Sequence, residues 1–211
     1  ACKKQVVEPI NTPFKESEAH RKETFQNGDI IFQTSTSAQS KAIQLATHSK
    51  YSHMGMILEK DGSWYVLEAV QPVKYTPIEE WVDRGEKDAY VVKRLQNSQE
   101  LLDSIAIEGL KKEGAKYLGK DYDLQFAWSD EKIYCSELVW KMYKAVLGVE
   151  LGALEELQDF DLSHPMVQRL QAQTIQFTDS SFKSFLLNVQ AADSLAYNAA
   201  GMPTAIDLNA N

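Results

Sequence analysis

The sequence is poor in cysteine, in basic residues and in long apolar runs. With 2 cysteines in 211 residues, it cannot build the disulfide framework of a small secreted domain. Its 22 lysines and arginines against 30 acidic residues give a net charge of −8, which argues against broad binding of nucleic acid or of anionic lipid. No apolar run approaches the roughly 20 residues that a bilayer-spanning helix needs.

Metal-binding spacings are also missing. The 4 histidines and 2 cysteines show no HxxxH or CxxC pattern, so we expect no metal site and no other cofactor. We expect no disulfide either, because Cys2 lies in a polar tail and Cys135 in a packed segment. What is present is 44% apolar and 25% charged residues, the balance of a globular protein long enough to bury a full core.

The apolar residues predict one domain, at 25–190, between polar tails at 1–24 and 191–211. Periodic and alternating apolar positions predict its elements. Strands are expected at 30–33, 53–59, 64–70 and 89–95, helices at 16–25, 37–47, 78–82, 98–117 and 135–148, a loop with a helix at 159–171, and a strand or buried segment at 182–190. The helix at 98–117 would be capped by Ser98 and would turn four apolar residues inward, Leu102, Ile105, Ala106 and Leu110.

Cys135 is the residue that carries most information about function. It stands where an apolar-aromatic stretch meets an amphipathic helix, in KIYCSELVWKMYKAVLG. A thiol at a helix N-terminus faces unpaired backbone N–H groups and the positive end of the helix dipole, and both favour the thiolate. The alternative is a small buried hydrophobe, the ordinary role of a free cysteine.

The hairpin upstream of Cys135 tests whether a histidine and a carboxylate can meet. Asp61-Gly62 between two apolar runs is a strong hairpin signal. A two-residue turn there pairs Lys60 with Ser63, and continuing the register sets Glu68 opposite Gly55 and diagonal to His53, on the same face of the sheet. A loop with an odd number of residues would place His53 and Glu68 on opposite faces.

These residues together make a nucleophilic site. Cys135 would supply the sulfur nucleophile, His53 would take and return its proton, and Glu68 would orient the ring. The Cys135 backbone N–H is a candidate oxyanion donor. Because Glu137 opposes a thiolate near the helix start, we expect His53 to activate the thiol more than the helix does. His48 is an alternative base, and Trp128 a candidate wall of the substrate cleft.

Several motifs resemble one known family when they are taken in order. NGDIIFQ, ATHSKYSHMGMILEKDGSWYVLEAV, GKDYDLQFAW, IYCSELVW and FDLSHPMVQ together resemble the circularly permuted YiiX/YebB-like branch of the NlpC-type papain-like cysteine peptidases. The resemblance spans residues 25–190. In the unpermuted relatives the cysteine precedes the histidine, whereas here His53 and Glu68 precede Cys135, which is the order of the permuted branch.

The resemblance implies an α+β fold, with a small antiparallel sheet or barrel packed against the helix that carries the nucleophile. It matches Cys135 to the nucleophile, His53 to the base and Glu68 to the polar third residue. In the unpermuted enzymes a tyrosine upstream of the cysteine helps to form the oxyanion site. Tyr122, 13 residues before Cys135, is the candidate for that role, and a turn tyrosine half packed on the core is the alternative.

The resemblance also implies a location in the cell envelope and a choice among functions. We expect a cysteine peptidase or amidase that cleaves an amide bond of an envelope substrate, such as a peptidoglycan stem peptide, through an acyl-enzyme. One alternative is an acyltransferase or hydrolase acting on a lipid or an N-acyl amine. The other is a binding module without catalysis.

Cys2 is a candidate lipidation site. Bacterial lipoproteins are cleaved just before a cysteine that becomes lipidated, usually after a small residue, and the chain begins Ala1-Cys2. We therefore expect membrane attachment through a lipid anchor at Cys2. The alternative is an ordinary cysteine beside a cloning remnant.

Overall fold

A computed structural model describes residues 25–174, apart from 38, 96, 153, 157 and 158, together with 183–184. The predictions for both tails, for Cys2 and for nearly all of the helix at 16–25 lie outside the described residues. Of the segment expected at 182–190, the structure describes the short strand β7, Lys183–Ser184, which pairs with β6, Glu155–Glu156.

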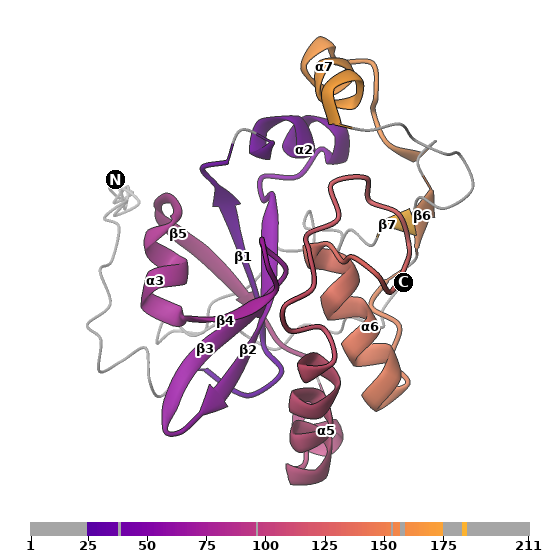
Figure 1. Ribbon diagram of the computed structural model, residues 1–211. Coiled ribbons are helices and arrows are strands. Elements are labelled where there is room, and N and C mark those ends of the chain that lie inside the picture. Colours follow the sequence, from indigo (N-terminus) through magenta and orange to yellow (C-terminus); the bar gives the residue numbers. More distant parts are fainter. Residues whose placement is uncertain are drawn as a thin grey trace, which may run out of the picture.

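The centre of the fold is a five-stranded antiparallel sheet in the order β4-β3-β2-β1-β5 (Figure 1). Its strands are β1 Ile30–Ser35, β2 His53–Lys60, β3 Ser63–Glu68, β4 Lys74–Pro77 and β5 Gly85–Lys93. The helices are α2 Ser40–Thr47, α3 Ile78–Asp83, α4 Ser98–Leu101, α5 Ser104–Ala115, α6 Cys135–Leu147 and α7 Pro165–Thr174. None of the described helices is long and apolar enough to cross a membrane.

Each face of the sheet is covered by helix, because successive residues of a strand point to opposite faces. On one face Met54, Met56 and Leu58 of β2 share a core with residues of α5 and α6. On the other face Ile57 and Val66 pack with Trp81 of α3. The expected α+β fold, an antiparallel sheet packed against the cysteine helix, is confirmed.

The predicted hairpin register is confirmed. Asp61 and Gly62 have φ values of 53° and 76°, as the two-residue type I′ turn requires, and Lys60 pairs with Ser63. Further along, Met56 pairs with Leu67, so the next step sets Gly55 beside Glu68. A Cβ at Gly55 would overlap the Val66 side chain and lie 2.9 Å from the Leu67 carbonyl oxygen, so a glycine lets the strands approach here.

The long helix predicted at 98–117 is wrong. The chain forms two helices, α4 and α5, which are separated at Leu102 and Asp103. The Asp103 carboxylate accepts a hydrogen bond of 2.8 Å from the Ala106 N–H, so Asp103 caps a second helix. The prediction of one helix capped by Ser98 did not include this second start. Leu110 is buried as expected, but Ile105 is 81% exposed because it lies in the first turn of α5, beyond the core.

Candidate active site

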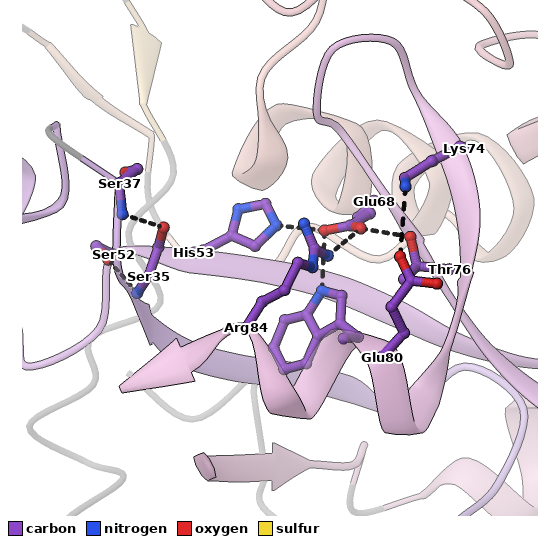
Figure 2. A network of polar contacts seen from close by, with 10 residues as sticks. Ser35, Ser37, Ser52, His53, Glu68, Lys74, Thr76, Glu80 and Arg84 are labelled. Atoms are coloured by element: carbon purple, nitrogen blue, oxygen red, sulfur yellow. Dashed lines mark hydrogen bonds and ion pairs between the residues drawn. The ribbon is translucent and has the colours of Figure 1, made fainter. Parts of the chain in front are cut away.

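Three elements bring His53, Glu68 and Cys135 together. His53 is the first residue of β2, Glu68 the last of β3 and Cys135 the first of α6. The His53 Nε2 atom lies 2.6 Å from Glu68 Oε2 (Figure 2), and the ring also forms a hydrogen bond with the Cys135 thiol. Because Nε2 is engaged by Glu68, Nδ1 is the ring atom that remains for the sulfur.

Contacts of the backbone before His53 and of its ring hold this residue in place. The residue before it, Ser52, donates its N–H to the Gln33 carbonyl at 3.0 Å, and its hydroxyl accepts from the Ser35 N–H at 2.9 Å. The ring itself stacks on Trp81, with centroids 5.9 Å apart and planes inclined by 26°. The imidazole is therefore fixed both through the backbone and through its face.

Glu68 is fully buried, and four donors surround its carboxylate. Oε2 accepts from His53 and, at 2.9 Å, from the indole Nε1–H of Trp81. Oε1 accepts from the Thr76 hydroxyl at 2.6 Å and from the Arg84 guanidinium (Figure 2). A buried carboxylate is tolerated when it is paired and hydrogen-bonded in this way.

The charges favour a thiolate and an imidazolium. Burial alone would lower the pKa of His53, but its bonds to Cys135 and Glu68 raise that pKa to about 9. Burial would raise the pKa of Cys135, yet His53 lowers it, followed by the N–H groups of Met54 and Ser136. Burial would likewise raise the pKa of Glu68, and the contacts with His53, Thr76 and Arg84 lower it. The proton therefore resides on the ring between sulfur and carboxylate.

The helix contributes less to the thiolate than the histidine does. The Ser136 N–H in the first turn of α6 lowers the pKa of Cys135, but by less than His53 does. Nearby, Glu137 is buried and forms an ion pair of 2.8 Å with Lys141. Burial raises the pKa of Glu137 to about 7, so this carboxyl is partly protonated near neutral pH and opposes a thiolate less than a full charge would.

Tyr122 lies at the thiol. A backbone bridge to Ile133 and a hydrogen bond of 2.7 Å from its N–H to Gln71 Oε1 position the residue. Its hydroxyl forms a hydrogen bond with Cys135, and burial and the Cys135 charge raise its pKa well above the usual value. The phenol therefore keeps its proton and can donate it in a hydrogen bond to an anion at the sulfur.

Two other candidates from the sequence lie differently. The His48 side chain is 68% exposed, and its ring lies 3.8 Å from Asp161, whereas the ring that contacts Cys135 is that of His53. Trp128 is half-buried and packs edge-on against Tyr134, the residue before the nucleophile, with centroids 6.5 Å apart. It thus packs beside the residue that precedes Cys135, and its role as a wall of the substrate cleft stays a prediction.

The sequence reasoning missed the residues that surround Glu68. Trp81 is buried in the core, and its indole N–H is also a donor to the carboxylate. Thr76 could have been found, because β4 continues the antiparallel sheet and sets Thr76 beside Val66 on the Glu68 face. Arg84 gave no signal in the sequence, since it follows a short helix whose placement depends on tertiary packing.

A solved structure is similar to this chain in fold. The crystal structure of the metalloprotein YiiX from Escherichia coli O157:H7 matches this chain with a TM-score of 0.70 and 48% identity, covering 75% of this chain and 87% of that one. In the part of this chain that the structure describes, no three His, Cys, Asp or Glu side chains are placed to hold a metal. At the active site Cys135 and His53 could supply two metal ligands. The Glu68 carboxylate is already occupied by four hydrogen-bond donors, so the four ligands that zinc takes are not assembled there.

Sequence comparison agrees with the fold. The protein YiiX of Escherichia coli strain K12 is 52% identical over 143 residues, which is 68% of this chain and 69% of YiiX. The family of permuted papain-like amidase enzymes, YaeF/YiiX, matches residues 24–188. The expected resemblance to a permuted papain-like, YiiX-like family is thereby confirmed, and this chain belongs to the permuted papain-like amidase family of YaeF and YiiX.

Proposed function

We propose that the protein hydrolyses an amide bond through an acyl-enzyme on Cys135, with His53 as proton carrier and Glu68 as the residue that orients it. The observation that carries this proposal is the continuous line from the thiol through the imidazole to a buried carboxylate 2.6 Å away. The description of the family as an amidase supports it.

The reaction proceeds in two halves. In the first, the Cys135 thiolate attacks the amide carbonyl carbon, and the resulting oxyanion accepts hydrogen bonds from the Tyr122 hydroxyl and the Cys135 N–H. The imidazolium of His53 then protonates the amide nitrogen, the C–N bond breaks, and the amine leaves a thioester. In the second half, neutral His53 takes a proton from water, the hydroxide attacks the thioester, and the acid leaves as the thiolate and imidazolium reform.

The substrate we propose is a peptide amide of the cell envelope, such as a peptidoglycan stem peptide. Its support is the resemblance to NlpC-type peptidases together with the amidase description of the family. We likewise propose the cell envelope as the site of action.

A second candidate substrate is an N-acyl amine. A series of aromatic contacts runs beside the nucleophile, because Phe126 packs against both Tyr122 and Tyr134, at 6.5 and 5.3 Å between centroids. Trp128 adds an edge contact to Tyr134, which is itself buried. The exposed parts of the half-buried Tyr122, Phe126 and Trp128 rings offer apolar surface to an acyl chain. This surface favours an apolar acyl group over a charged one.

Turnover of both substrate classes can be compared directly. A Cys2→Ser background leaves Cys135 as the one thiol of the given sequence. The protein is incubated with muropeptides or with long-chain N-acyl amines, and the products are identified by mass spectrometry. We expect hydrolysis of one class, its loss in Cys135→Ala and in His53→Gln, and a thioester adduct on Cys135. His48→Gln is the matched control and should retain activity.

Two results would contradict the proposal. Hydrolysis that persists in Cys135→Ala would exclude the thiol as nucleophile. Binding of either ligand without any turnover or adduct would favour a binding module that keeps the fold, and would exclude the amidase.

A further inference from the structure

We infer that Arg84 is a positioning residue of this site, one that sets the proton affinity of His53 by sharing the carboxylate of Glu68 with it. This inference rests on the proposed function, since it concerns the proton that His53 carries. Arg84 follows α3, whose Trp81 packs in a different core cluster from the residues of α6. Its ion pair with Glu68 is the contact that links it to the chemistry.

The geometry divides the carboxylate between two cations. Oε1 accepts from the Arg84 guanidinium and from Thr76, whereas Oε2 accepts from His53 and Trp81 (Figure 2). Two cations on one carboxylate repel each other, and each weakens the hold of the carboxylate on the other. The series of sulfur, imidazole, carboxylate and guanidinium then alternates in charge and sums to zero.

The other charged groups near His53 and Glu68 have partners of their own. Lys74 lies opposite Glu68 in the β3–β4 pair, but its ammonium lies 3.7 Å from Glu80 of α3. From β1, the residue opposite His53 is Gln33, which is buried and uncharged. From the α6 side, the ring meets Cys135, whose thiol also contacts the neutral phenol of Tyr122.

The second half of the reaction explains why such a cation would be useful. While the acyl-enzyme exists, the thiolate is absent and His53 has to be neutral to accept a proton from water. A buried carboxylate with full charge and no other partner would hold the ring protonated at that stage. Arg84 weakens this hold without removing the carboxylate that orients the ring.

The proton affinity of His53 can be measured without a substrate. In the Cys2→Ser background, Cys135 is alkylated by iodoacetate and by iodoacetamide across pH. The anionic reagent is attracted by the imidazolium and the neutral one is not, so the ratio of the two rates falls as His53 loses its proton. Wild type should show this fall near pH 9, the pKa to which its partners raise His53.

We expect Arg84→Gln, and Arg84→Met as a second variant, to move the fall upward by about 0.5–1 pH unit, the lower end of what a neighbouring charge produces, because the Arg84 side chain is 39% exposed. Arg84→Lys should restore the wild-type midpoint. Lys74→Met removes another cation, on the residue that pairs with Glu68 across the β3–β4 ladder, and should leave the midpoint unchanged. A merely structural role for Arg84 would change folding stability without this pattern.

The outcomes separate the inference from the proposed function. If wild type shows the fall and folded Arg84→Gln shows it at the same pH, Arg84 does not tune His53 and the inference is overturned. An upward shift of the same size in Lys74→Met would overturn it as well, because any nearby cation would then serve. If wild type shows no fall at all, the thiolate–imidazolium pair itself is absent and the proposed function fails first.

Discussion

Two buried charges lie on opposite faces of the same sheet, and their surroundings differ. Glu68, on the α3 face, has four donors around its carboxylate. Lys93, on the face covered by α5 and α6, is equally buried. Among the described residues, its ammonium lies 5.7 Å from the centre of the Phe32 ring and has no carboxylate within ion-pair distance.

The comparison shows that burial alone does not decide whether a charge survives. Burial lowers the pKa of Lys93 to about 8, whereas the donors around Glu68 overcome burial and lower its pKa below the usual value. The donors around Glu68 favour its charged form, whereas burial of Lys93 favours its neutral form. The sheet therefore keeps a stable charge where the proposed chemistry needs one and a weakly held charge where it does not.

The largest effect is expected from Glu68→Gln. The amide keeps the shape but leaves Arg84 and His53 without their anion, and breaking one side of a buried ion pair costs about 3–5 kcal/mol of unfolding free energy. The pKa of His53 should fall, and the rate of Cys135 alkylation at pH 6 should fall with it. Urea unfolding and iodoacetamide labelling measure the two effects.

The pH dependence of stability checks the same carboxylate. Because the folded pKa of Glu68 is lowered, its contribution is present above the unfolded value of about 4.5 and is lost as pH falls through the folded value. The stability difference between wild type and Glu68→Gln should therefore shrink on acidification below pH 4.5. A variant as stable as wild type at pH 7 would contradict the role of the four donors.

The half of the site that lies on the hairpin could be predicted from the sequence. A type I′ turn at Asp61-Gly62 fixes the register, and the register fixes which face His53 and Glu68 share. The Cys135 helix was likewise predictable from its amphipathic pattern and its Gly148 stop, where φ is 69°.

The other half depends on tertiary packing. Trp81 and Arg84 reach Glu68 because α3 lies across the sheet, and no local pattern in six residues of helix specifies that placement. The error at Ile105 arose differently. Apolar spacing continues from α4 into α5, whereas the Asp103 side chain offers the backbone a cap that starts a new helix.

Lys93→Met should have the opposite sign from Glu68→Gln. Methionine fills a similar volume without a charge that burial disfavours, so we expect it to stabilise the protein at pH 7 by about 2 kcal/mol, the scale of the pKa shift less the lost contact with Phe32. The folded pKa of Lys93, about 8, lies below the unfolded value of 10.5. Between these two pH values the unfolded chain binds more protons than the folded protein, so wild-type stability rises as pH increases from about 8 to 10.5. The gain in Lys93→Met should thus fade by pH 10.5.

Urea unfolding of the two proteins at pH 7 and pH 10 measures this difference, in which the other titrating groups cancel. A destabilised Lys93→Met at pH 7 would mean that the ammonium has a favourable partner in the folded protein, and the contrast between the two faces would be lost.

The smallest effect is expected from Thr76→Val, which removes one of the four donors and keeps the shape of the side chain. The Thr76 hydroxyl donates to Glu68 Oε1 at 2.6 Å and is fully buried. Hydrogen bonds to charged groups contribute about 1.5–3 kcal/mol, and the lower end applies because three donors remain. Thr47→Val is the matched control, since that hydroxyl donates to the neutral Ile43 carbonyl at 2.8 Å and should cost less.

The two threonines together measure what the carboxylate charge adds to a hydrogen bond. If Thr76→Val costs about 1.5 kcal/mol more than a near-neutral Thr47→Val, the donors around Glu68 act on its charge, and the pH at which the alkylation ratio falls should also rise slightly. Equal costs for the two variants would mean that Trp81, Arg84 and His53 hold the carboxylate without help from Thr76. Thr76 would then only fill space beside it, and the contrast with Lys93 would rest on the other three donors.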